Sequence, residues 1–222
     1  MYSLNSIVIL FGTGVIIISF VFSLLIRKYK IGYMQWFFIC PLIALFSSIN
    51  SIYSLFFPAY HMGFMYTVQS FFFVLDFIFW YAFFNRILNN QNETKKLKIL
   101  LFATLILVVY LIFFSSAGRQ NLHVLALTVT CKAIFCLLFF HNLIKNLIYK
   151  NITKEPAFWI VTGLFFYSSL SLPFYGLHSY IKMHFSLIIS SNIFSVSNML
   201  IIVMHFSFIK AYTCIIHQHR VS

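Results

Sequence analysis

Asp76 and Lys132 are charged side chains that interrupt otherwise apolar stretches of the chain. Opposite charges taken out of water are stabilised by each other when the fold brings them together. We therefore expect an ion pair between them. Such a pair would act as a gate, a proton relay or a ligand counter-ion, or it would only lock two elements together.

The remaining acidic residues, Glu93 and Glu155, lie in short basic segments. Paired-carboxylate mechanisms need two such groups at one site, and the three acidic residues do not supply them. The sequence also has no phosphate-binding glycine loop, no Gly-x-Ser-x-Gly turn and no CxxC spacing. We predict a protein that is not an enzyme and has no cofactor and no structural disulfide or metal.

Four histidines fall near the ends of apolar stretches: His61, His123, His178 and His184. Histidine titrates near neutral pH and ligates metals, so a pH- or metal-sensing cluster is one interpretation. No two of them have the i, i+4 spacing of a helix-borne metal site. We favour scattered interfacial side chains.

The medium around these residues follows from composition: 62% of the 222 residues are hydrophobic, 21% are aromatic and 8% are charged. Soluble chains carry about a quarter charged residues, and one core of this size could not hide so much apolar surface. We predict an integral membrane protein whose main partner is the lipid bilayer. Nucleic acid is not a predicted partner, although the net charge is +12, because the basic residues lie in short gaps between apolar runs.

A helix needs about 20 apolar residues to cross a bilayer. By this criterion the chain is one all-α domain, 1–222, with seven membrane-spanning helices, and the long run before Asn85 is divided near Pro58 and Gly63. The predicted spans are approximately 5–26, 34–57, 64–85, 99–117, 121–142, 157–177 and 184–209.

Basic residues orient these spans, because they favour the cytoplasmic side. Twelve of the fifteen fall on one face: Arg27, Lys28, Lys30, Arg86, Lys95, Lys96, Lys98, Lys145, Lys150, Lys154, Lys210 and Arg220. The opposite face receives Arg119 and Lys182, and Lys132 lies within a span. The pattern predicts an outside N-terminus and a cytoplasmic C-terminus.

In this topology the third and fifth spans both run inward. At 1.5 Å per residue, Asp76 lies about 18 Å deep and Lys132 about 16 Å deep. An isolated charge at this depth costs about 2.5–3.5 kcal/mol on insertion scales. Pairing reduces that cost, and intramembrane ionisable groups are functional by default.

Other polar residues recur at helical spacing and should face the interior of the bundle. For Ser47, Ser54, Ser191 and Ser195 we favour a role in hydrogen bonding between helices. Asn50, Gln69, Asn198 and His205 are larger polar groups, and we predict that they form an intramembrane polar centre with Asp76 and Lys132.

Two segments carry a resemblance to a known family. The third span runs from Tyr66-Thr67-Val68-Gln69 to Phe84-Asn85-Arg86-Ile87-Leu88, and the sixth begins Pro156-Ala157-Phe158-Trp159-Ile160 and continues through Gly163 and Tyr167. In these features the chain resembles a poorly characterised family of bacterial seven-helix membrane proteins of about this size. Such proteins resemble companions of histidine kinases and other signalling components. The family often has an acidic residue where Gln69 stands.

The resemblance implies a sensory or partner-binding bundle in a bacterial cytoplasmic (inner) membrane, with a signalling protein or a second copy of the chain as its partner. The Asp76–Lys132 pair supports an alternative, a small-solute or ion transporter or channel. A lipid-modifying enzyme that uses His205 or the outer histidines is a third, weaker hypothesis.

Overall fold

The fold was analysed in a computed structural model that describes residues 4–29, 32–56, 62–88, 91–114, 117–146 and 152–221. Within these ranges there are seven long helices, one short helix, two 3-10 turns and no strand. The predicted all-α class is therefore confirmed.

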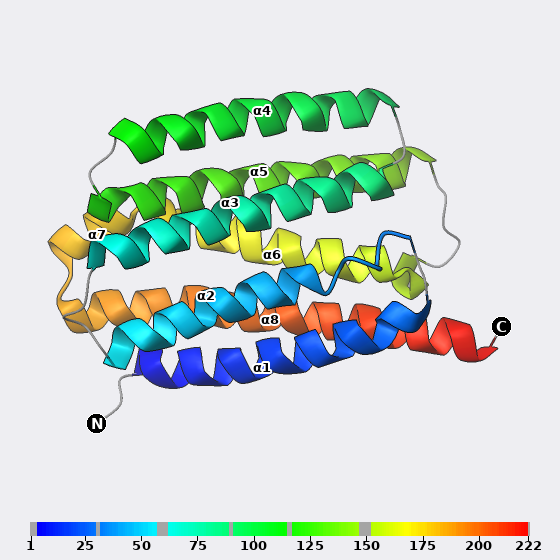
Figure 1. The fold of residues 1–222 in the computed structure, drawn as a ribbon, viewed down its shortest axis with the longest axis horizontal. Helices are drawn as coiled ribbons and strands as arrows, with labels where there is room; N and C mark the ends of the chain where they lie inside the picture. Colours follow the sequence, from blue (N-terminus) through cyan, green and yellow to red (C-terminus); the bar gives the residue numbers. More distant parts are fainter. Residues whose placement is uncertain are drawn as a thin grey trace.

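The elements follow one another as α1 (Leu4–Ile26), η1 (Arg27–Tyr29), α2 (Ile39–Phe56), α3 (Met62–Ile87), α4 (Gln91–Phe114), α5 (Ala117–Asn146), η2 (Ile152–Lys154), α6 (Pro156–Gly176), α7 (His178–His184) and α8 (Leu187–Val221). The long helices lie side by side along one common direction (Figure 1). The outer end of the bundle is here the end at which α1 begins, and the inner end is the one at which α8 ends.

Five of these helices, α1, α3, α5, α6 and α8, are long and apolar enough to cross a membrane. Helix α2 contributes a shorter apolar stretch, Ile39–Tyr53, and α4 begins with a charged turn that contains Glu93 and Lys96. Several helices are thus compatible with membrane integration. The seven crossings and their orientation stay predictions.

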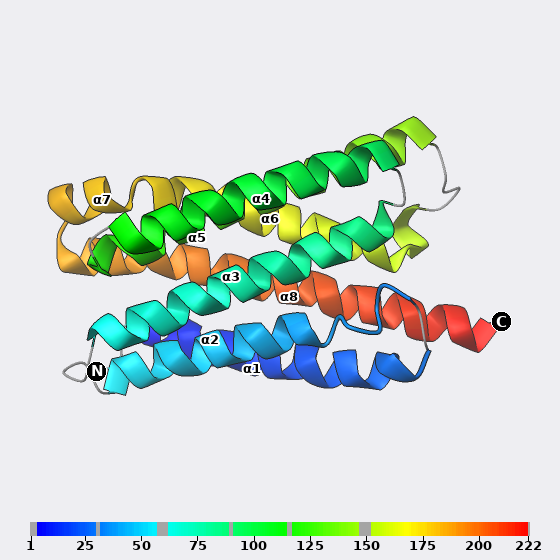
Figure 2. The same cartoon turned by 45° about the horizontal axis from the view of Figure 1, so that its top comes forward.

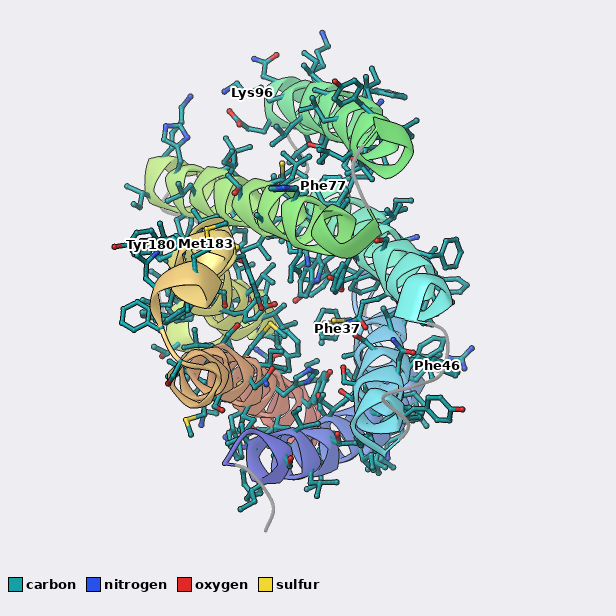
Figure 3. The ribbon with its side chains drawn as sticks, turned by 90° about the vertical axis from the view of Figure 1, so that its left-hand side faces the viewer. Phe37, Phe46, Phe77, Lys96, Tyr180 and Met183 are labelled. Atoms are coloured by element: carbon teal, nitrogen blue, oxygen red, sulfur yellow. The ribbon has the colours of Figure 1, made fainter. Side chains whose placement is uncertain are left out.

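Six helices form a closed ring in the order α1, α2, α3, α5, α6 and α8, and α8 packs back against α1. Helix α4 lies outside the ring against α5 and, over a smaller contact, α3 (Figures 1 and 2). Viewed from the outer end, the six helices surround a centre into which side chains project, and Lys96 of α4 lies well away from it (Figure 3).

Gly163 of α6 lies at a close contact with α8. A Cβ atom at this position would lie 2.6 Å from the Cβ of Ser207 and 3.2 Å from the carbonyl oxygen of Met204, both on α8. Only a glycine allows the two backbones to approach this closely, which is how small residues act between membrane helices. Pro156 occupies the first turn of α6, where the missing N–H removes no helix hydrogen bond.

An aromatic cluster fills the inner half of the ring. Its centre is Phe37, which is fully buried and lies inside the ring in Figure 3. The Phe37 ring lies 5.9 Å from that of Trp80 on α3 and 5.3 Å from that of Phe208 on α8. Because a tilted contact also reaches Phe83 and an edge-to-face contact reaches Tyr212, the cluster closes the ring at this depth.

Phe37 does not belong to a helix, which differs from the sequence-based expectation. The second span was predicted from residue 34, whereas α2 begins at Ile39. Before it, residues 32–38 form turns, with the amide of Phe37 donating to the carbonyl of Met34 over 3.0 Å. The last helix differs too, because α8 continues past residue 209 to Val221.

Candidate functional site: a polar cavity inside the helix ring

The outer and middle parts of the ring enclose a cavity with two adjoining compartments. The middle compartment has a volume of about 120 Å³ and the outer one about 260 Å³. They share the wall residues Ile16, Ser47, Ser48, Phe73, Leu125, Tyr167 and Ile201. All six ring helices contribute to this wall, so the cavity exists only in the assembled ring.

Asp76 lies in the middle compartment, where both carboxylate oxygens accept hydrogen bonds. Lys132 Nζ on α5 donates to Oδ2, and the two side chains form an ion pair. Trp80 Nε1, one helical turn further along α3, donates to Oδ1 over 3.0 Å. Lys132 is nearly buried, with 5% of its side chain exposed, whereas 22% of the Asp76 side chain is accessible. The predicted ion pair is therefore present, and it faces the cavity.

Three neutral side chains form a hydrogen-bonded chain between α2 and α3. Asn50 Nδ2 donates to Gln69 Oε1 over 2.8 Å, and Gln69 Nε2 donates to Ser47 Oγ over 3.3 Å. Gln69 and Ser47 line the outer compartment. The amide at position 69 thus satisfies both its donor and its acceptor without an ionised partner. An ionised carboxylate at this position could not donate to Ser47.

His205 of α8 lines the middle compartment together with Asp76 and Lys132. Its side chain is fully buried, and neither Nδ1 nor Nε2 has a hydrogen-bond partner among the described residues. A buried polar group without a partner costs about 1–3 kcal/mol. His205 therefore places an imidazole without hydrogen-bond partners at the wall of the middle compartment, where its nitrogens are covered in this structure.

A tyrosine pair adds hydroxyl groups to the same cavity. Tyr167 and Tyr175 of α6 both line the outer compartment, and their hydroxyl oxygens lie 3.5 Å apart. The hydroxyl of Tyr175 lies 2.7 Å from Ser197 Oγ on α8. Asn198, the next residue of α8, also lines this compartment.

The structure brings the six predicted polar-centre residues to one cavity. Five of them line it, and Asn50 reaches it through Gln69. The tyrosine pair and the contribution of α1, where Thr13 and Gly12 line the outer compartment, were not predicted from the sequence. The spacing of Tyr167 and Tyr175, eight positions apart on one helix face, was a signal that could have indicated the pair.

The serine predictions divide into two groups. Ser47 bonds across helices as expected, and Ser195 is buried. The side chains of Ser54 and Ser191 lie outside the described part of the structure.

The outer histidines form no described site. His123 and His184 are exposed, and the ring of His184 stacks on Tyr180 with centroids 4.1 Å apart. His61 and the side chain of His178 lie outside the described residues. Within those residues, no three His, Cys, Asp or Glu side chains are grouped so that they could hold a metal ion.

Comparisons with protein-family models, curated proteins and solved structures found no match to this chain.

Proposed function

We propose that the protein is a non-enzymatic sensory membrane bundle: it binds a small polar solute in the central cavity and passes the change along α8 to a signalling partner. The observation that carries this proposal is the course of α8. The helix lines the cavity with Asn198 and His205 and then continues without a break to Val221.

The length of α8 supports transmission across the membrane. At 1.5 Å per residue, its 35 residues extend about 52 Å, whereas the hydrocarbon core is about 30 Å thick. The helix projects beyond its neighbours at the inner end of the bundle (Figure 1). A displacement at His205 would therefore be carried rigidly to the projecting end.

Two contacts fix the inner part of α8 to the first turn of α6 and to the segment before it. Gln218 Nε2 donates to the carbonyl of Lys154 over 2.9 Å, and the Lys210 ammonium lies 5.9 Å from the centre of the Trp159 ring. These contacts are weak enough for a partner to compete with them, since exposed cation–π contacts contribute about 0.5–1 kcal/mol.

The composition of the cavity wall supports a neutral solute. Asp76 and Lys132 neutralise each other, and the described walls of the outer compartment carry only hydroxyl, amide and apolar side chains. An additional charge would have to be desolvated without a counter-ion, at about 2.5–3.5 kcal/mol. A solute with hydroxyl or amide groups would instead bond to His205.

Photo-crosslinking tests the sensory proposal. A photoreactive amino acid replaces the exposed His217 on the projecting end of α8, and a matched control replaces the lipid-facing Ile106 on α4, which is 69% exposed. We expect one partner to be captured from position 217 and not from 106, with a yield that changes severalfold when His205→Phe alters the cavity. Equal crosslinking yields from position 217 in the wild type and in the His205→Phe variant would contradict the proposal.

The membrane topology is part of the proposal: seven crossings in a bacterial cytoplasmic membrane, with the N-terminus outside and the basic inner end in the cytosol. It is supported by α1 beginning and α8 ending at opposite ends of the bundle (Figure 1), as an odd number of crossings requires. Fusions to alkaline phosphatase and to green fluorescent protein at the C-terminus test it, because the first is active only outside and the second fluoresces inside.

A small-solute transporter or channel is the second candidate, because the cavity extends inward as far as Asp76. In this structure the aromatic cluster around Phe37 closes the inner half, so transport would require that cluster to open. Solute flux into proteoliposomes, followed by light scattering with glycerol and urea, tests this candidate. It loses its basis if flux is absent or is unchanged by Asp76→Asn and Lys132→Met.

A further inference from the structure

An apolar groove lies on the outside of the ring, between α2 and α3 near the inner end. Its volume is about 400 Å³. Its walls are Tyr33, Trp36, Ile39, Ile43, Leu75, Ile78, Phe79, Ala82, Phe83 and Arg86. Nine of these ten side chains are apolar or aromatic, and Arg86 is the one that carries a charge.

The groove exists because α2 is short. Helix α2 begins only at Ile39, and the turns of residues 32–38 bend into the ring so that Phe37 can pack there. The inner part of α3 is therefore left without a full helical neighbour on this side. Trp36 and Ile78 remain exposed, at 51% and 41%, along the resulting groove.

Arg86 places a positive charge at the inner end of this groove. Its side chain is exposed and forms no salt bridge within the described part of the chain. The described groove residues include no carboxylate that would neutralise this guanidinium group.

We propose that the groove binds an anionic phospholipid, with an acyl chain along the apolar walls and its phosphate on Arg86. A guanidinium is planar and binds phosphate oxygens in pairs, and basic sites between membrane helices on the cytoplasmic side take anionic headgroups. The predicted topology places Arg86 at that side. The lipid also touches the cavity wall, because Ile43 lines both the groove and the middle compartment.

Native mass spectrometry of the purified protein tests the proposal with two lipids that share palmitoyl and oleoyl chains, one phosphatidylglycerol and one phosphatidylcholine. We expect the wild type to bind phosphatidylglycerol about fivefold more tightly, since each basic residue near the headgroup contributes about 1 kcal/mol. Arg86→Gln should abolish most of this preference, and Arg86→Lys should retain part of it. Ala82→Phe, which fills the groove, should reduce the binding of both lipids.

The control is Lys96→Gln on α4, whose side chain is 59% exposed and lies outside the ring (Figure 3). It should leave the preference intact. The proposal is overturned if Lys96→Gln lowers the preference as much as Arg86→Gln, if Arg86→Gln has no effect, or if Ala82→Phe leaves lipid binding unchanged. Variants that do not run as monodisperse protein in size-exclusion chromatography are replaced by Ala82→Leu and Arg86→Ala, to which the same criteria apply.

Discussion

The ammonium of Lys132 on α5 donates to the carboxylate of Asp76 on α3, and this ion pair joins residues 56 positions apart in the chain. Trp80 fixes the second carboxylate oxygen, so the carboxylate is held from two helices. The contact joins α3 directly to α5 within the ring, and α4, which connects them in sequence, remains outside.

The pair should be strongly coupled in stability. Removing one partner leaves the other charge buried, which costs about 3–5 kcal/mol, whereas replacing both is often nearly neutral. We expect Asp76→Asn and Lys132→Met each to lower the free energy of unfolding strongly, and the double variant to lose less than the sum. Unfolding in mixed micelles measures this double-mutant cycle.

Lys95 of α4, which is exposed and forms no salt bridge within the described residues, provides the control. Surface substitutions of this kind usually change stability by no more than about 0.5 kcal/mol, so Lys95→Met should change little. If the variants at Asp76 and Lys132 are no more costly than this control, the ion pair has no special role in the bundle.

Gly163 should tolerate no side chain. Gly163→Ala places a methyl group against Ser207 on α8, and such overpacking costs about 1–3 kcal/mol. Gly14→Ala on α1 is the matched control, because nothing lies within 4 Å of its added Cβ and alanine favours a helix by about 0.5–1 kcal/mol. Opposite shifts in thermal midpoint are expected, and a neutral Gly163→Ala would show that α6 and α8 can separate at little cost.

The aromatic cluster should depend on Phe37 far more than on its neighbour. Phe37→Ala removes a fully buried ring, and such truncations cost about 3–5 kcal/mol. Trp36→Ala removes a larger side chain that is 51% exposed, so its effect should be much smaller. Equal losses of unfolding free energy in chemical denaturation would mean that the turns of residues 32–38 do not contribute a packed side chain to the core of the ring.

The cavity should admit water while the lipid face does not. Ser47 lines both compartments, whereas the adjacent Phe46 is 50% exposed on the outside of α2 and points away from the ring (Figure 3). In a background with the native cysteines changed to serine, a hydrophilic methanethiosulfonate should label Ser47→Cys faster than Phe46→Cys, because the reactive form is the thiolate. The reverse order would place the polar face of α2 elsewhere.

Glu155 should give the stability a pH dependence. Burial raises the pKa of its carboxyl above the ordinary value for glutamate, so the folded state holds this proton more tightly than the unfolded state. The contribution to stability is full below the unfolded pKa and is lost as pH rises through the folded pKa. Glu155→Gln should therefore match the wild type in acid and exceed it at neutral pH in thermal unfolding. A variant that is less stable at neutral pH would show that the positive end of α6 stabilises the carboxylate more than burial penalises it.

Much of this architecture could be predicted from the sequence. Apolar runs with charged gaps indicated where each long helix lies, because a chain in lipid must satisfy its backbone hydrogen bonds within each helix. Counting residues from the start of each run also placed Asp76 and Lys132 at one level, since the rise per residue of a helix is constant. The polar positions of α2, α3 and α8 face the interior of the ring, as predicted, because lipid offers no hydrogen-bond partners.

Only the tertiary structure decided which helices are neighbours. Hydropathy does not show which helices pack against each other, because all membrane-spanning helices have similar apolar sequences. The neighbours are chosen by complementary shape, as at Gly163 against Ser207. The exclusion of α4 from the ring, the insertion of Phe37 from a turn and the lack of hydrogen-bond partners for the His205 nitrogens all follow from that packing. A cavity is a property of the space between helices, and that space is defined only once six of them have closed around it.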